Sequence, residues 1–342
     1  MHMTRFTTKL LAVAMYILGA VCQGGGQEIE IGVIDFYGLN RVSADQVRRA
    51  LMFKEGDTLS SEAVTAAQNR IAKVPGVARA RINVVCCDRG RTIMYVGIEE
   101  QGATTITFRP APRGAARLRP EIVRAGEEYS RALTSAVQRG DAGEDRSQGH
   151  ALVHDAATRA VQEHFIVYAT RDLAELRSVL RESSDASQRA LAAQIIAYAP
   201  DKQAVVEELV RGMSDPAEQV RNNAMRALWV FAEAGSGAAG SRLRIPTQPF
   251  MVFLRSLVWS DRNKASGVLM ALSSDRDPAL LQTLRKEALI PLVEMARWKN
   301  AGYALPSFVI LARIAGYSDQ AAHDLLEGGH REVVIEAAMK RL

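Results

Sequence analysis

Cysteine is scarce in this chain, at only 3 of 342 residues. Three cysteines cannot build the disulfide framework of a small secreted domain. Cys86 and Cys87 are adjacent, and a disulfide between neighbouring residues would be strained. We therefore expect one of the pair to be a buried small side chain and the other to lie near a turn. A redox or metal role is the alternative.

Two short motifs of common catalytic folds are also missing. The chain contains neither the G-x-x-x-x-G-K loop that cradles nucleotide phosphates nor the G-x-S-x-G elbow of α/β-hydrolases. The sequence therefore predicts no cofactor and no enzymatic activity.

Neither sign of charge dominates. The chain has 43 Lys and Arg against 38 Asp and Glu, a formal net charge of +5. This excess is too small for a chain of this size to indicate a nucleic-acid partner. An apolar content of 48% excludes a mainly disordered protein.

The apolar run near the N-terminus is short. Arg5 and Lys9 precede residues 10–21, and a run of this length suits the core of a signal peptide better than a membrane span. We expect residues 1–22 to be a signal peptide and the remainder to be exported to the periplasm or cell envelope, an oxidising compartment. A lipid anchor at Cys22 and an uncleaved anchor are the alternatives.

Residues 28–100 have the pattern of a small β-α-α-β-β unit. Ile29, Ile31 and Val33 alternate with less apolar residues, as in a half-buried strand. Ser43 and Gln46 match a capping box at the start of a first helix, and Ser60 or Ser61 can cap a second. Two further strands follow on either side of a turn at residues 88–90.

The order of these pieces resembles a POTRA domain, a periplasmic module of outer-membrane assembly, secretion and division proteins. The matching pieces are Tyr37-Gly38, Val42-Ser43, Phe53-Lys54-Glu55-Gly56-Asp57 and Val74-Pro75-Gly76-Val77. The resemblance implies that a partner adds a strand to an exposed sheet edge. If the strand order follows the family, that edge consists of Ala78, Arg79, Ala80, Arg81, Ile82, Asn83, Val84 and Val85. The alternative is a sheet that only spaces other domains.

Residues 101–119 differ in composition from their surroundings. Prolines alternate with Arg109, Arg113, Arg117 and Arg119, which is typical of an extended linker. We expect these arginines to be solvated; contact with anionic lipid headgroups or with an acidic partner is the alternative. Pro120 suits the first turn of the next helix.

The rest of the chain, residues 120–342, reads as one helix after another. From residue 172 onward, three stretches repeat a Ser-Asp pair followed by a basic residue and an apolar helix. They contain Asp185 with Arg189, Asp215 with Arg221, and Asp261 with Lys264. The aspartates suit helix N-caps, and the basic residues can pair with them or with the next repeat. The stretch from Asp215-Pro216 to Leu228 resembles the second helix of a HEAT repeat, which implies an α-solenoid that binds proteins. A purely structural array is the alternative.

His150 and His154 are the only candidate metal ligands with a suggestive spacing. On a helix, two histidines at i and i+4 share a face, and acidic residues surround them here. Asp155 is better explained as a helix N-cap, which places His150 in the preceding loop. We interpret both histidines as solvated or hydrogen-bonded, and residues 144–155 stay the candidate for a metal site.

The sequence therefore predicts an α+β protein with a POTRA-like unit and a HEAT-like array. We predict a non-enzymatic scaffold of the cell envelope that binds other proteins, in the envelope or outer membrane, through the sheet edge and the repeat surface. Membrane association would come from a lipid on Cys22 or from the basic linker. The alternatives are a metal-dependent envelope factor or enzyme that uses residues 144–155, and a periplasmic holdase-type chaperone.

Overall fold

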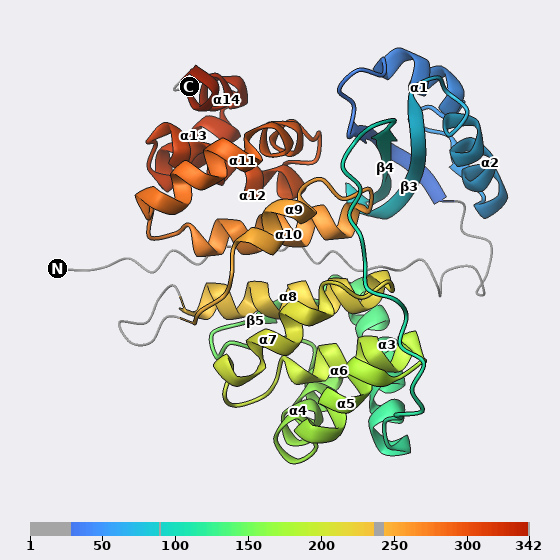
Figure 1. Cartoon of the computed structure of the whole chain (residues 1–342), viewed down its shortest axis with the longest axis vertical. Coiled ribbons are helices and arrows are strands. Elements are labelled where there is room, and N and C mark those ends of the chain that lie inside the picture. Colours follow the sequence, from blue (N-terminus) through green and yellow to red (C-terminus); the bar gives the residue numbers. More distant parts are fainter. Residues whose placement is uncertain (1–28, 89, 236–242, 341–342) are drawn as a thin grey trace.

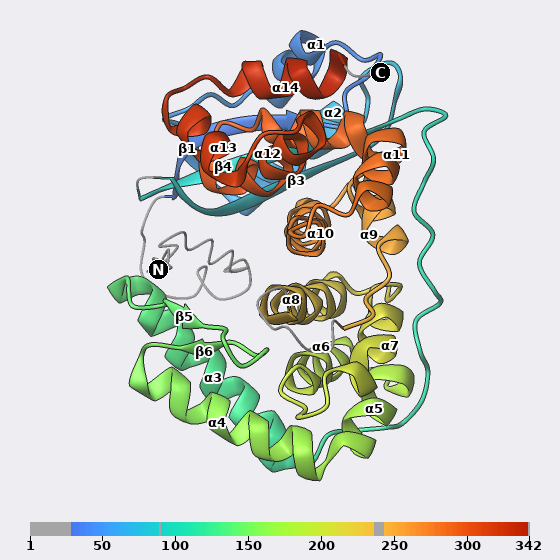
Figure 2. The ribbon, with the colours of Figure 1, turned by 90° about the vertical axis from the view of Figure 1, so that its left-hand side faces the viewer.

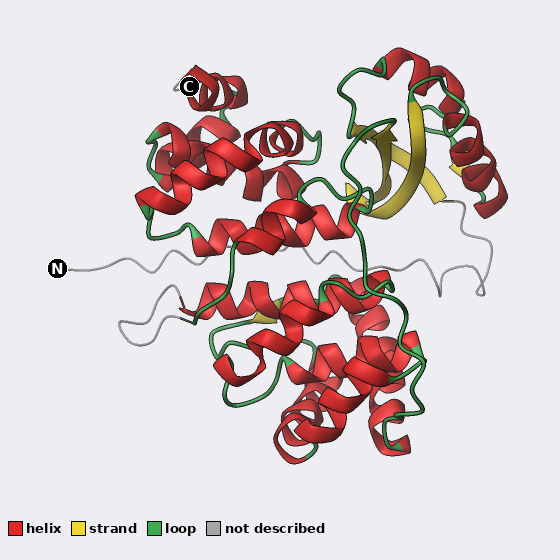
Figure 3. Cartoon of the chain, in the orientation of Figure 1, coloured by secondary structure: helices red, strands yellow, loops and turns green. Residues whose placement is uncertain are grey.

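The computed structural model describes residues 29–88, 90–235 and 243–340. The predicted signal peptide and Cys22 lie outside these residues. Four of the six described strands gather in one unit, and helices make up nearly all of the rest (Figure 3). This arrangement confirms the α+β class and the order of a small mixed unit followed by helical repeats.

The N-terminal unit is a four-stranded sheet with two helices. Its elements are β1 (Ile29–Tyr37), α1 (Ala44–Leu51), β2 (Thr58–Leu59), α2 (Ser61–Ile71), β3 (Val77–Asp88) and β4 (Arg91–Glu100). The strand order is β2-β1-β4-β3, with β1 parallel to β4 and the other pairs antiparallel. Ser60 caps α2 by accepting a bond from Ala63 N–H, whereas Ser43 makes no side-chain cap bond, so the predicted capping box is not formed.

Both faces of this sheet are buried. One face packs on α1 and α2 through an apolar cluster that includes Ile34, Val47 and Ile71. On the other face, Tyr37 and Tyr95 join the core of the helical array. The sheet therefore lies between its own two helices and the array.

The array consists of paired helices. They are α3 (Pro120–Arg139), α4 (Ala156–Arg171), α5 (Leu173–Glu182), α6 (Ala186–Ile196), α7 (Gln203–Gly212), α8 (Glu218–Gly235), α9 (Gln248–Phe253), α10 (Trp259–Leu272), α11 (Pro278–Ala296), α12 (Ala301–Ala315), α13 (Asp319–Glu327) and α14 (Arg331–Lys340). The even-numbered helices from α6 to α14 pack on one another in sequence, and each carries its odd-numbered neighbour (Figure 1). A hairpin of β5 (Glu144–Asp145) and β6 (Leu152–Val153) separates α3 from α4. None of the described helices is both long and apolar enough to cross a membrane.

Residues 101–119, which we call the strap, connect the sheet to the far end of the array. The sheet packs on the C-terminal helices, so the strap runs along one side of the array before α3 begins (Figure 2). Its backbone is tied to the loops between paired helices. Arg109 N–H donates to Ser214 O at 2.9 Å, and Gly114 N–H donates to Glu182 O at 2.8 Å.

The expectation that the strap arginines are solvated is wrong for Arg109 and Arg119, which form ion pairs with the array, whereas Arg113 and Arg117 are exposed. Arg109 binds the Asp215 carboxylate at 2.7 Å, and Arg117 donates to Ser183 Oγ at 3.2 Å. Arg119 pairs with Asp172 and, at 3.0 Å, with Glu175. These arginines fasten the strap to the array, because each faces a carboxylate or hydroxyl on the helix ends that it crosses.

Aromatic side chains fix the sheet to the array. The Tyr95 ring stacks on Trp259, with centroids 5.2 Å apart, and lies 4.9 Å from Trp298. Tyr37 Oη donates to Leu257 O and Tyr303 Oη to Cys86 O, both at 2.7 Å. The large buried rings and the hydroxyl bonds of Tyr37 and Tyr303 make this junction part of one core.

Buried arginines connect successive repeats of the array. Arg189 donates to Asp215 of the next repeat at 2.8 and 2.9 Å, and Arg221 donates to Asp261 of the repeat after that at 3.0–3.2 Å. Burial alone would raise the pKa of Asp215, but hydrogen bonds from Arg189 and Arg109 keep that pKa below its usual value. The pairing therefore runs from each repeat to the next.

The third repeat departs from the predicted motif. In each repeat an arginine donates to the carbonyl six residues earlier: Arg189 to Ser183, Arg221 to Asp215, and Arg262 to Ser256. Arg262, which then pairs with Glu294 at 2.6 Å, therefore occupies the position predicted for Lys264. Asp185 caps α6, whereas Asp261 lies inside the first turn of α10 as the acceptor for Arg221.

Replacing Arg221 with methionine should destabilise the array strongly. The change leaves the buried Asp261 carboxylate without its cation, which costs about 3–5 kcal/mol in the free energy of unfolding. Urea denaturation followed by circular dichroism measures it. Arg297→Met is the matched control, because Arg297 and Glu332 form a similar pair that is about half exposed, and its loss should cost ~1 kcal/mol or less. Equal effects of the two substitutions would contradict the role of the buried pairs.

Candidate protein-binding surface

Strand β3 forms one edge of the sheet, because it pairs with β4 and with no other described strand. It contains all eight residues, 78–85, of the predicted partner-binding edge. The family-based expectation of which strand lies at the edge therefore agrees with the strand order.

The backbone groups that face outward from β3 follow from one hydrogen bond. Ile82 N–H donates to the Gln68 side-chain oxygen at 3.0 Å, so it points away from β4. Antiparallel pairing alternates between residues that face the partner strand and residues that face away. Ala80 and Val84, two positions away on either side, therefore also direct their N–H and C=O groups outward. An edge with outward backbone groups is a template for strand addition.

Some side chains of the edge strand contact the helical array, and others contact only the sheet. Arg81 pairs with Glu218 of α8 at 2.5 Å, and the buried Asn83 side chain accepts a bond from Trp259 N–H at 2.9 Å. These two residues hold the sheet on the array. Arg79 forms a two-pronged pair with Glu99 of the neighbouring strand β4, and its side chain is half exposed.

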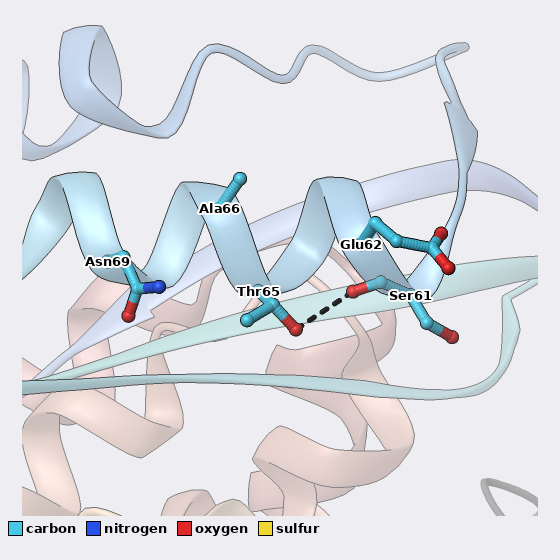
Figure 4. Close-up of a pocket in the computed structure, with 5 residues that line it drawn as sticks. All are labelled: Ser61, Glu62, Thr65, Ala66 and Asn69. Atoms are coloured by element: carbon cyan, nitrogen blue, oxygen red, sulfur yellow. Dashed lines mark hydrogen bonds between the residues drawn. The ribbon is translucent and has the colours of Figure 1, made fainter.

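A surface hollow lies along α2, beside this edge. Figure 4 shows the residues that line it, all on α2: Ser61, Glu62, Thr65, Ala66 and Asn69. Gln68 of the same helix reaches β3, so the hollow is next to the edge strand. The lining is small and polar, and Thr65 Oγ1 already donates to Ser61 O at 2.9 Å.

The opposite side of the sheet is closed by anchored side chains. There, Ile34 N–H donates to the Glu55 carboxylate at 3.2 Å. Glu55 is held by Lys299 of the array at 2.6 Å, and this hydrogen bond is the main reason why the pKa of Glu55 is lowered. Lys299 N–H in turn donates to Asp35 at 2.8 Å. The β1 side is thus occupied by a network that spans both units.

The structure does not bring the two candidate metal ligands into a metal site. Asp155 caps α4 by accepting from Thr158 N–H at 2.8 Å, which leaves His150 and His154 in the preceding segment. His150 is buried, and its Nδ1 lies 3.4 Å from Lys202 Nζ. Burial lowers the pKa of His150, and the positive charge of Lys202 lowers it further. His154 is exposed. Within the described ranges, no group of three or more His, Cys, Asp and Glu side chains is placed to hold a metal.

Instead, the hairpin that carries these histidines is fastened to the array by charge. Glu144 accepts from Arg146 at 2.9 and 3.0 Å and also pairs with Arg226 of α8. Arg146 continues to Glu233 at 3.0 Å, and its guanidinium lies over the Trp229 ring at 5.5 Å. Glu144, which belongs to the predicted metal site, therefore forms ion pairs with Arg146 and Arg226.

Lys264 is buried next to this cluster, with Nζ 5.8 Å from the Trp229 ring centre. Burial lowers its pKa to about 7, and the positive charges of Arg226 and Arg146 act in the same direction, while Glu144 opposes them. The lysine predicted as a repeat-motif residue is thus a buried amine between α8 and α10 that titrates near neutral pH.

Cys86 is disulfide-bonded, which corrects the expectation of unpaired cysteines. The partner side chain lies outside the described part of the chain. Cys86 O also accepts the Tyr303 hydroxyl bond, so the array holds this end of β3.

Three important residues escaped the sequence analysis. Gln68 looked like an ordinary surface residue of α2, and nothing in the sequence singles it out. Arg262 could have been found from the six-residue spacing to a turn carbonyl, which the Ser-Asp alignment concealed. Glu218 gave no signal, because its partner Arg81 is 137 residues away.

Lys264→Met should make stability less dependent on pH. Between about pH 7 and the ordinary lysine pKa of 10.5, the unfolded chain binds a proton at this position that the folded chain does not. The free energy of unfolding contributed by Lys264 therefore rises with pH in that window and is lowest below it. Denaturant titrations at several pH values between 7 and 10 should give a smaller slope for the variant. The exposed Lys340→Met is the control, and an unchanged slope for Lys264→Met would refute the assignment.

Comparison with known proteins found a family resemblance for the N-terminal unit. The sequence model of the POTRA family, described as "Surface antigen variable number repeat", matches residues 29–84, which run from β1 into β3. No curated protein matches the chain. Similar solved structures include a designed armadillo repeat protein (16% identity, TM-score 0.35, 57% of this chain and 97% of that one) and another in complex with the peptide (KR)4 (15%, 0.35, 65% and 98%). Residues 29–84 are therefore similar to POTRA domains, and the structure itself shows the helical repeats that follow them.

Proposed function

We propose that this protein is a non-enzymatic scaffold of the cell envelope that captures an extended segment of a partner protein along β3. The observation that carries the proposal is the open edge at Ala80 and Val84, on a sheet whose two faces are both covered. Strand addition uses backbone hydrogen bonds, and it needs only an edge.

The covered faces narrow the choice of binding mode. A ligand that lay flat on the sheet would have to displace α1 and α2 on one side or the Tyr95–Trp259 contact on the other. Binding of a strand on the β1 side would require breaking the ion pair between Glu55 and Lys299. The β3 edge, with half-buried Ala80 and Val84, is the site that costs least to occupy.

Two observations support an exported protein. The N-terminal sequence combines basic residues with a short apolar run, as in a signal peptide. Cys86 is disulfide-bonded, and such bonds persist mainly in oxidising compartments. The partner in this proposal is another envelope or outer-membrane protein, and the helical array holds a second partner or a second part of the same one.

Site-specific photo-crosslinking in the native cell tests the proposal. A photoreactive residue at Arg79 stands at a half-exposed position of the edge strand β3, and one at Ile290, 62% exposed on α11, reports on the array. A dominant crosslinked envelope protein at Arg79 supports edge capture. Crosslinks at Ile290 without any at Arg79 would leave the sheet as a spacer and refute edge capture.

A proline at residue 84 should weaken capture while the array stays folded. Val84 N–H points away from β4, so Val84→Pro removes an edge donor without breaking the β3–β4 ladder. We expect the yield of the Arg79 crosslink to fall about tenfold. Val84→Thr, which keeps the N–H group, is the control. Asn83 is unsuitable for this test, because its backbone faces β4 and its side chain binds Trp259 N–H. An unchanged yield with Val84→Pro would contradict strand addition.

A further inference from the structure

The Gln68 side chain occupies the central outward donor of the edge. Its oxygen accepts Ile82 N–H at 3.0 Å, in the position that a carbonyl of an added strand would take. Ile82 is flanked by Ala80 and Val84, so a strand that paired with the whole edge would meet Gln68 in the middle. Gln68 thus makes the hydrogen bond that one backbone carbonyl of a partner strand would make.

The matching contact on the other side of the sheet is built differently. There, Glu55 accepts Ile34 N–H and is itself fixed by an ion pair with Lys299. Gln68 is half-buried, and its side chain makes no other hydrogen bond to a residue in the described ranges. The β1 side of the sheet is therefore closed by the ion-paired Glu55 carboxylate. The β3 side is closed by the neutral Gln68 amide, which no ion pair holds in place.

We propose that Gln68 is a displaceable gate on the β3 edge, an inference that rests on the proposed capture function. When the edge is empty, Gln68 satisfies Ile82 N–H and so protects the strand from indiscriminate pairing. A partner strand replaces the Gln68 oxygen with its own backbone carbonyl, and the amide side chain turns toward the hollow beside Thr65 and Asn69.

The gate sets a requirement on the partner. Exchange of one neutral acceptor for another changes little free energy by itself, so a single contact at Ile82 does not open the edge. A segment must also bond the outward groups of Ala80 and Val84, which requires an extended stretch with a free N–H at the pairing positions. Continuous strands are accepted, and short or proline-interrupted segments are rejected.

The first measurement is amide hydrogen exchange, by NMR, on the chain without its N-terminal 22 residues. In the unaltered sequence, Ile82 should exchange more slowly than Ala80 and Val84. Gln68→Ala should speed Ile82 exchange at least about tenfold, because the acceptor is gone. Asn69→Ala, one residue along α2, is the control and should leave it unchanged. Unchanged Ile82 exchange in Gln68→Ala overturns the gate.

The second measurement uses a soluble eight-residue peptide of alternating threonine and valine with lysine at both ends. Gln68→Ala should bind it about fivefold more tightly, and Gln68→Glu more weakly, since a charged acceptor holds Ile82 N–H more strongly. Equal affinities of the three proteins would overturn the gate. If Ile82 exchange responds as expected but no variant binds the peptide, the hydrogen bond is assigned correctly and the proposed capture function is refuted.

Discussion

The buried arginine pairs are the interaction on which this structure depends. Three successive repeats place an arginine that reaches back to its own turn and forward to a carboxylate of the next repeat, namely Arg189, Arg221 and Arg262. Buried ion pairs are costly unless their hydrogen bonds are satisfied, so the geometry between repeats is tightly constrained. The strap adds to the same network, because Arg109 shares Asp215 with Arg189 and Phe108 lies under the Arg221 guanidinium at 4.1 Å.

The attachment of the strap to the array determines where the sheet lies. The strap crosses the repeats and leads to the N-terminal helices, while the sheet packs on Trp259 and Trp298 of the C-terminal ones. The C-terminal helices thus pack against the N-terminal sheet, so the two ends of the described chain lie together. Both faces of the sheet are used for packing, and among the described strands β3 has one side without a neighbouring strand.

The helical array also accounts for residues that resemble a catalytic or metal site. Glu144, His150 and Lys264 are polar side chains with little exposure, and in isolation such residues suggest chemistry. Here the carboxylate neutralises two arginines, the histidine lies beside Lys202, and the lysine packs on Trp229. Their perturbed pKa values follow from burial between helices, and no reactive arrangement is needed to explain them.

The local elements and their order follow from the amino-acid sequence alone. Period-two alternation, the cap at Asp155 and Pro120 at the start of α3 are short-range signals, because each depends on residues within one turn or strand. Tertiary structure decided the rest: which face of β3 meets the array, that Arg262 replaces Lys264 in the repeat pattern, and that Gln68 reaches Ile82. These contacts join residues that are far apart in the chain or on different elements, so their partners are set by how the elements pack.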